Sequence, residues 1–220
     1  MKMSRIALAF ASLISLLGAI AFAASFAKHA ISGEHGGAFG ILWHQFKYFT
    51  LWTNVLVMVL FARMSITGRF LSDSWLAALT LWMLIVMAVF HLLLGNDEAQ
   101  RGLSWVSDTL FHTVNPLLLA LWWTVFAPKS DLRWRHGAVW LLWPLVYVIY
   151  AVTRGIRTGF YPYFFVNLAD IGWGGLMAWG MKFLIAFYVA GLLVVAIGRM
   201  INQIAPARRE DYAPDDPRPL

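Results

Sequence analysis

The sequence has no cysteine and few charged residues. Only 13% of its 220 residues are charged, whereas about a quarter is usual for a soluble domain. Without cysteine there is no disulfide, no Cys-ligated zinc and no thiol nucleophile. The shortage of charge excludes an ordinary soluble enzyme, a disordered chain and a nucleic-acid-binding module. The net charge of +6 is explained by the Lys and Arg residues that collect in cytoplasmic loops of membrane proteins, so we expect no nucleic-acid partner.

Apolar residues make up 60% of the chain, and the mean hydropathy is +0.68. A membrane-spanning helix needs about 20 apolar residues. Six runs fit or approach that length: 6–27, 44–62, 75–94, 108–126, 137–152 and 176–198. They predict an all-α fold, a polytopic bundle of six transmembrane helices forming one domain over residues 1–204. Residues 205–220 are rich in proline and charge and are predicted to be a disordered cytoplasmic tail.

The first run has a second interpretation. Lys2 and Arg5 precede it, and Ala21-Phe22-Ala23 resembles a signal-peptidase site, so the run also has features of a secretory signal peptide. Its length favours a first span.

Loop charges predict the orientation, because Lys and Arg are enriched on the cytoplasmic side. With six spans, one side carries eleven of the 17 basic residues and the other side carries six. The richer side holds both ends of the chain. Both termini are therefore predicted to be cytoplasmic.

Three of the predicted spans carry polar residues on one helical face, which is costly in a bilayer unless the residues are paired or face a cavity. The predicted stripes are Lys47, Thr50 and Asn54 on the second span; Asp108, His112 and Asn115 on the fourth; and Tyr147, Tyr150 and Arg154 on the fifth. All three lie toward the outer ends of their spans. Matching depth predicts one shared polar cavity that opens toward the outer leaflet.

His112 has two interpretations. Asp108 lies one turn away on the same face, so its carboxylate is placed to hold the imidazole in a fixed tautomer, as in a catalytic triad. The same spacing also suits a structural polar lock, and Asp108 at the start of a span also suits a helix N-cap. The other spans' histidines, His44 and His91, show no metal-ligand spacing, so we expect neither a metal ion nor a cofactor.

Short motifs in a defined order resemble a known family. These are Lys47-Tyr48-Phe49-Thr50 with Asn54, Phe111-His112-Thr113-Val114-Asn115-Pro116, Trp143-Pro144-Leu145-Val146-Tyr147, and Tyr161-Pro162-Tyr163. They resemble the androgen-induced and androgen-dependent TFPI-regulating membrane proteins and their bacterial relatives, over about residues 43–170. The resemblance implies six spans, a bacterial inner (cell) membrane location and a threonine hydrolase that cleaves fatty acid esters of hydroxy fatty acids. It also implies Thr50 as the nucleophile and His112 as the base. Asn54 follows Thr50 at four residues instead of the family's three, so Thr53 is a second candidate nucleophile.

These residues give a mechanistic hypothesis. Thr50 attacks a lipid ester, His112 takes its proton, and Asp108 orients His112. Asn54 or Asn115 would donate to the oxyanion. Lys47 and Arg154, with Tyr147 and Tyr150 on the same face as Arg154, would bind a free carboxylate, while segment 160–175 with Tyr161 would form a lid. The partners would be a fatty acyl ester and the bilayer. The alternatives are a non-enzymatic lipid-binding or scaffold protein and, less favoured by the one-sided polar cluster, a small transporter.

Overall fold

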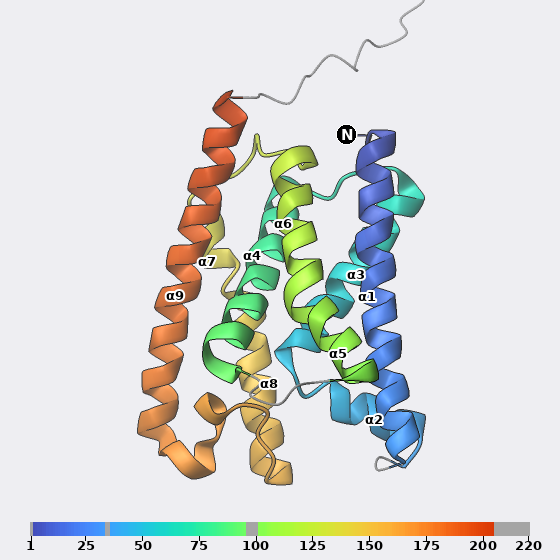
Figure 1. Ribbon diagram of the computed structural model, residues 1–220. Coiled ribbons are helices and arrows are strands. Elements are labelled where there is room, and N and C mark those ends of the chain that lie inside the picture. Colours follow the sequence, from blue (N-terminus) through green and yellow to red (C-terminus); the bar gives the residue numbers. More distant parts are fainter. Residues whose placement is uncertain (1, 34–35, 96–100, 205–220) are drawn as a thin grey trace, which may run out of the picture.

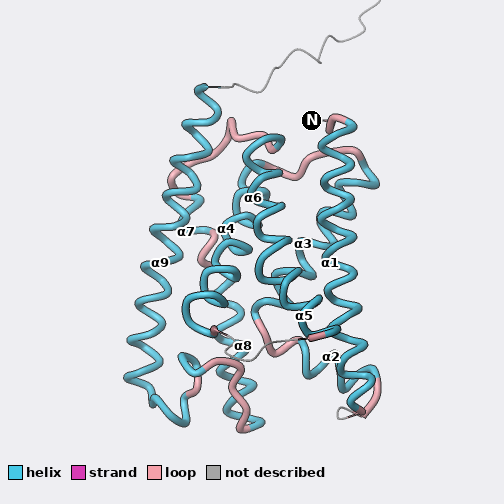
Figure 2. The backbone as a smooth tube through the Cα atoms, viewed as in Figure 1, coloured by secondary structure: helices cyan, strands magenta, loops and turns pink. Residues whose placement is uncertain are grey.

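A computed structural model describes residues 2–33, 36–95 and 101–204. Within these ranges the chain is a bundle of helices without a strand (Figures 1 and 2). The helices are α1 Arg5–Ser32, α2 Ala38–Gln45, α3 Phe49–Thr67, α4 Asp73–Val89, η1 Phe90–Leu94, α5 Gly102–Thr109, η2 Leu110–Val114, α6 Asn115–Phe126, α7 His136–Val139, α8 Leu142–Thr158, η3 Phe164–Val166 and α9 Leu168–Ile204. Six segments are long and apolar enough to cross a membrane. The prediction of an all-α, six-span bundle is confirmed, and the chain has the architecture of an integral membrane protein.

The described chain begins and ends at the same end of the bundle, where the start of α1 and the end of α9 lie (Figure 1). An even number of spans requires this arrangement. The opposite end carries α2, the start of α5 and the loop that contains η3 (Figure 1). The predicted cytoplasmic orientation stays a prediction, and the predicted tail lies outside the described residues.

The core lies where α1 packs on α3 and α6. Small side chains, Ala7 and Ala11, are fully buried on α1, and small residues allow membrane helices to approach closely. Trp122 of α6 is also fully buried and donates its indole N–H to the Ala7 carbonyl at 2.9 Å. α1 is thereby an integral part of the bundle.

The second span begins later than predicted. His44 ends up in the short helix α2, and residues 46–48 separate it from α3. Side chains satisfy the backbone carbonyls that this break releases: Trp52 donates to the Phe46 carbonyl at 2.8 Å, and Tyr147 donates to the Lys47 carbonyl at 2.7 Å. A break in the helix is tolerated in a membrane protein only when such groups are paired. Lys47 was predicted to share a helical face with Thr50. This prediction is wrong, because Lys47 lies in the break before α3.

Two spans contain a turn of π-helix. In the third span η1 follows α4, and in the fourth span η2 joins α5 to α6. π turns are rare and concentrate at functional sites. The fourth span also begins at Gly102, several residues before its predicted start, so Asp108 lies inside a helix and is not an N-cap.

The fifth span is interrupted at residues 140–141, between α7 and α8. Pro144 has no N–H to donate to the carbonyl four residues earlier, and Trp82 donates to that carbonyl, of Trp140, at 3.0 Å. The sixth span extends over Leu168–Ile204 with a kink at Gly172, whose φ is 60°. It therefore includes the second half of the segment predicted to be a lid.

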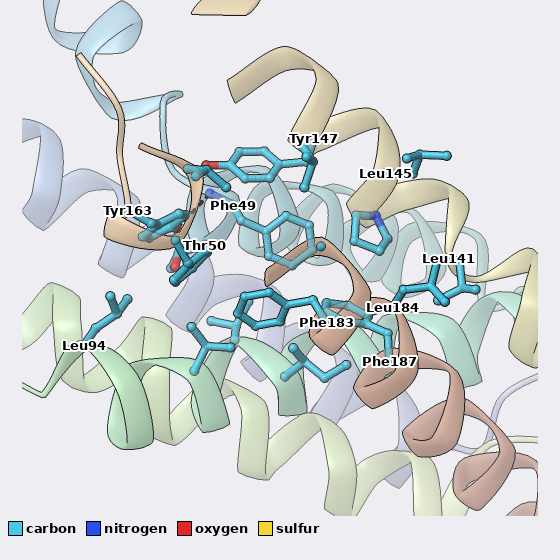
Figure 3. A pocket seen from close by; sticks show the side chains of 18 of the residues that line it. Phe49, Thr50, Leu94, Leu141, Leu145, Tyr147, Tyr163, Phe183, Leu184 and Phe187 are labelled. Atoms are coloured by element: carbon cyan, nitrogen blue, oxygen red, sulfur yellow. Dashed lines mark hydrogen bonds between the residues drawn. The ribbon is translucent and has the colours of Figure 1, made fainter. Parts of the chain in front are cut away.

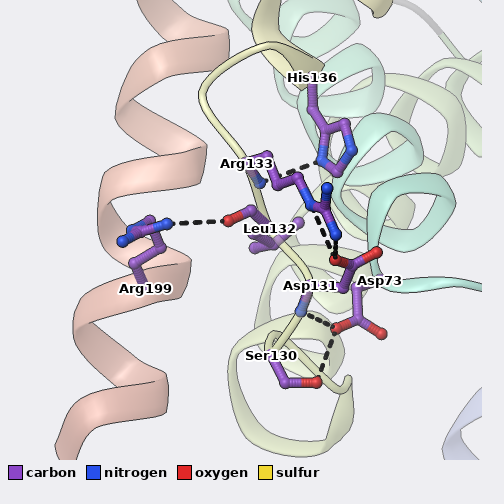
Figure 4. Close-up of polar contacts among 7 residues, drawn as sticks. All are labelled: Asp73, Ser130, Asp131, Leu132, Arg133, His136 and Arg199. Carbon is purple, nitrogen blue, oxygen red and sulfur yellow. Dashed lines mark hydrogen bonds and ion pairs between the residues drawn. The ribbon is translucent and has the colours of Figure 1, made fainter.

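Polar contacts fasten the loops at the end where the termini lie (Figure 4). The Asp73 carboxylate, at the start of α4, accepts from the Asp131 N–H at 2.8 Å and from the Ser130 hydroxyl at 3.3 Å. Arg199 of α9 donates to the Leu132 carbonyl at 3.2 Å. These bonds tie the loop between α6 and α7 to two spans, on the side away from the polar cluster described next.

Candidate functional site

Thr50 and His112 are in direct contact. The Thr50 Oγ1 lies 3.2 Å from Nε2 of His112, although 62 residues separate them in sequence. Thr50 is the second residue of α3, just after the helix break, and His112 is buried in the π turn η2. The structure thus brings together the two residues that sequence analysis assigned as nucleophile and base.

The other ring nitrogen of His112 determines which atom carries the proton. Nδ1 lies 3.1 Å from the main-chain carbonyl of Asp108. A carbonyl oxygen only accepts hydrogen bonds, so Nδ1 carries the hydrogen in this contact. Nε2 of the neutral imidazole is then an acceptor, and the Thr50 hydroxyl donates to it. This is the tautomer that a general base needs.

Packing holds the imidazole in place. Phe90, in the π turn η1, stacks on the His112 ring with centroids 3.8 Å apart and planes 6° from parallel. The two π turns are also linked by His91 Nε2 and Thr113 Oγ1, which are 3.0 Å apart. Sequence analysis missed Phe90, because one phenylalanine in an apolar span gives no signal.

Asp108 contributes differently from the expectation. His112 is bonded to its carbonyl oxygen and not to its carboxylate. The spacing that placed Asp108 one turn from His112 was right, but the residue four positions before a histidine in a helix also presents its main-chain oxygen to that side chain. The hydrogen bond that orients the His112 ring is made by the backbone of Asp108 and not by its carboxylate.

The two predicted asparagines lie on the spans that carry Thr50 and His112. Asn54 is buried and donates through Nδ2 to the carbonyls of Thr50 at 3.0 Å and Phe111 at 3.4 Å. Its N–H groups are therefore engaged, contrary to the expected role at the oxyanion. Asn115 is also buried, with its amide against Gly18 of α1, and among the described residues no hydrogen bond joins it to Thr50 or His112.

Thr53 points to a different neighbour. It is fully buried, and its Oγ1 accepts a hydrogen bond from the indole N–H of Trp143 on α8 at 3.2 Å. Of the two candidate nucleophiles, only Thr50 contacts His112 among the described residues.

Thr50 also borders a cavity of about 210 Å³ with almost entirely apolar walls (Figure 3). The walls come from α3, α4, η1, α8, α9 and the η3 loop, and they include Phe49, Val89, Leu145, Phe183 and Phe187. An engineered protein cavity of 150 Å³ is sufficient to bind benzene, so this cavity has room for part of a hydrocarbon chain.

A second pocket of about 430 Å³, called the basic pocket below, lies on the other side of the helix break and is lined by Lys47, Arg154, His44, Trp43, Gly40, Thr158 and Phe160. Burial, and next the charge of Arg154, lower the pKa of Lys47 to about 8. The one ion pair in the described part of the chain joins Arg133 to Asp131, so no described carboxylate neutralises the two cations here. Two buried positive charges with no acid partner in the described part of the chain suit an anionic group.

Aromatic and polar neighbours position these cations. Arg154 donates to the Tyr150 hydroxyl and to the Trp43 carbonyl, both at 2.7 Å, and lies 4.2 Å from the Trp43 ring centroid. Lys47 Nζ lies 3.2 Å from His44 Nε2 and 3.9 Å from the centre of the Phe160 ring. One face of α8 therefore carries the predicted stripe of Tyr147, Tyr150 and Arg154, and this face is turned toward Lys47 and Trp43.

The aromatic segment after α8 reaches the site through a tyrosine that sequence analysis did not choose. The Tyr161 ring packs against Gly155, where an added Cβ would lie 2.1 Å from it, and Tyr161 does not line the cavity at Thr50. Tyr163 does line it, and its hydroxyl accepts the Phe49 N–H at 3.1 Å (Figure 3). The motif Tyr161-Pro162-Tyr163 indicated that an aromatic residue of this segment contributes to the site. It did not indicate which of the two tyrosine rings faces the cavity.

The three histidines considered as metal ligands each have a different polar neighbour. His44 contacts Lys47, His91 contacts Thr113 and His112 contacts Thr50. In the described ranges no three His, Cys, Asp or Glu residues gather as a metal site would require.

No family model, no curated protein and no solved structure matches this chain.

Proposed function

We propose that this protein is an intramembrane lipid-ester hydrolase with Thr50 as its nucleophile and His112 as its base. The observation that carries the proposal is the 3.2 Å contact between Thr50 Oγ1 and His112 Nε2 at the edge of an apolar cavity. A nucleophile in hydrogen-bond contact with an oriented base is the arrangement that covalent catalysis requires. The order of motifs that resembles the androgen-induced and androgen-dependent membrane hydrolases supports the same assignment.

The reaction would have two stages. The Thr50 Oγ1 attacks the ester carbonyl carbon, its proton passes to His112 Nε2, and the carbonyl electrons move onto the carbonyl oxygen. As the tetrahedral intermediate collapses, the bond to the alcohol breaks, and His112 returns the proton to the leaving oxygen. Water then attacks the acyl-threonine with His112 again as base, which releases the acid and restores Thr50.

The two pockets support a substrate with an acyl chain and a free carboxylate, as in a fatty acid ester of a hydroxy fatty acid. The chain would lie in the apolar cavity beside Thr50, and the carboxylate would lie between Lys47 and Arg154. A desolvated carboxylate gains more from hydrogen bonds to cations than from neutral donors. We place the protein in a bacterial cell membrane, where such a substrate is reached from the bilayer.

The test is ester hydrolysis by the purified chain in detergent, with labelling by a fluorophosphonate. We expect turnover in the wild type, and loss of both turnover and labelling in Thr50→Ala. His112→Ala should keep binding but lose turnover by a factor of roughly 10² to 10⁴. Wild-type rates in both variants would refute the proposal.

A non-enzymatic lipid-binding protein is the second candidate, because the largely apolar cavity and the basic pocket suit an acidic lipid without any reaction. In that case His112→Ala would lower thermal stability, and no label would attach to Thr50.

A further inference from the structure

Tyr163 is placed at the nucleophile by a segment that lies outside the six spans. It belongs to the loop between α8 and α9, just before η3, and 9% of its surface is exposed. Its ring packs against those of Phe165 at 5.0 Å and Tyr48 at 6.0 Å. With a ring fixed on two sides, the hydroxyl has a defined position beside Thr50 (Figure 3).

The hydroxyl oxygen sits at the N-terminus of α3. It accepts the Phe49 N–H at 3.1 Å, and the Thr50 backbone and side chain lie within hydrogen-bonding reach of it. α3 has no side-chain cap from its own N-cap residue, Tyr48. Tyr163 therefore supplies a partner for an N–H group that the start of a helix leaves unpaired.

The phenolic proton of Tyr163 has the hydroxyl oxygens of Thr50 and Tyr147 within reach, and a charged substrate oxyanion is a stronger acceptor than either of them. A hydroxyl accepts through its lone pairs and donates one proton. The Phe49 N–H uses a lone pair of Tyr163, while the Thr50 proton is directed at His112. Burial raises the pKa of Tyr163 to about 12, so the phenol stays protonated at neutral pH.

We propose that Tyr163 is a catalytic residue that donates its phenolic proton in a hydrogen bond to the oxyanion formed when Thr50 attacks. The inference rests on the proposed hydrolase function. In the tetrahedral intermediate the Thr50 oxygen and the oxyanion are bonded to the same carbon, so a donor beside one lies close to the other. No bond to Tyr163 forms or breaks, and its proton stays on the phenol. Asn54, the donor expected from sequence, is occupied by two carbonyls, whereas Tyr163 lines the cavity at Thr50.

The experiment compares Tyr163→Phe with Tyr161→Phe in hydrolysis of a nitrophenyl fatty ester by the full chain in detergent micelles. Tyr163→Phe keeps the ring contacts and removes only the hydroxyl. Loss of one oxyanion donor lowers kcat by roughly 10² to 10³-fold, so we expect that fall with KM little changed. Tyr161→Phe should match the wild type, because the Tyr161 ring packs on Gly155, away from the cavity.

A second measurement separates catalysis from capping of α3. Fluorinated tyrosine at position 163 keeps the ring and the hydroxyl but lowers the phenol pKa. Because a phenolate cannot donate, kcat should fall as pH rises through the lowered pKa, while the wild type shows no such limb below about pH 10. A purely structural hydroxyl would leave the pH profile unchanged.

The outcomes distinguish the two proposals. An active wild type whose Tyr163→Phe variant keeps its kcat, or whose fluorotyrosine variant shows no alkaline limb, overturns the role of Tyr163 and leaves the hydrolase standing. If Tyr163→Phe does not fold, the fluorotyrosine profile decides alone. A wild type with neither ester turnover nor labelling of Thr50 overturns both.

Discussion

The hydroxyl of Thr50 donates to Nε2 of His112 from the first turn of one transmembrane helix to a π turn in another. The contact requires the α3 helix to begin at Phe49 and the fourth span to widen at residues 110–114. At both irregularities, side chains donate hydrogen bonds to backbone carbonyls. Trp52 and Tyr147 donate to the carbonyls of residues 46 and 47, and Asn54 donates to the Phe111 carbonyl. The site is therefore built where regular helix is interrupted in two neighbouring spans.

The first prediction concerns Asp108. Since the His112 Nδ1 binds its carbonyl oxygen, Asp108→Asn should change the rate of ester hydrolysis by less than about fivefold, because the atom in contact is retained. An orienting carboxylate would behave differently: its loss in a serine protease triad lowers kcat by roughly 10⁴-fold. Steady-state rates of Asp108→Asn beside His112→Ala decide between them, and a thousandfold loss in Asp108→Asn would restore the triad interpretation.

The second prediction separates the two threonines. Thr53→Ala leaves the partly buried Trp143 N–H without its acceptor, which should destabilise the bundle by about 1 kcal/mol, whereas turnover should stay near that of the wild type. Thr50→Ala should abolish turnover with a smaller effect on stability. Thermal unfolding in detergent and the rate of hydrolysis, measured on both variants, provide the comparison. Activity in Thr50→Ala together with its loss in Thr53→Ala would reverse the assignment of the nucleophile.

The sequence was sufficient to predict six spans and to single out Thr50 and His112, and the reason is physical. Polar groups are costly in a bilayer, so their rarity marks positions that must face one another, and this marked Thr50 and His112. The sequence could not predict which atom of Asp108 contacts His112, because the carbonyl and the carboxylate belong to the same residue. Tyr163 was also beyond reach, because its place at α3 depends on the path of a loop and not on helical periodicity. Lys47 was misplaced on a helical face because no residue type signalled the break at 46–48.

The third prediction is a pH dependence of binding at the basic pocket. Because the pKa of Lys47 is lowered to about 8, its positive charge is present below that pH and is lost as pH rises through it. The KM for an ester with a free carboxylate should rise over this range by about tenfold, the value of one charge-assisted hydrogen bond.

Two controls test that assignment. The methyl ester of the same substrate has no carboxylate, so its KM should not change between pH 7 and pH 9, a window of about one unit on each side of the lowered pKa. Lys47→Met should give the high KM at every pH for the acid. An equal rise for the methyl ester would assign the titration to a group other than Lys47.

The fourth prediction concerns Gly180 of α9, which lines the apolar cavity and whose added Cβ would meet no atom within 4 Å. Gly180→Leu should fill part of the cavity without strain, and it replaces a poor helix former by a good one. Each buried methylene contributes about 0.8 kcal/mol, so excluding two of them lowers kcat/KM by roughly tenfold. The ratio of kcat/KM for a palmitoyl ester to that for an octanoyl ester should fall accordingly. Gly174→Leu is the matched control, because Gly174 lies on the same helix with equal space around it but outside the cavity. A similar change of the ratio in both variants would mean that the acyl chain does not occupy this cavity.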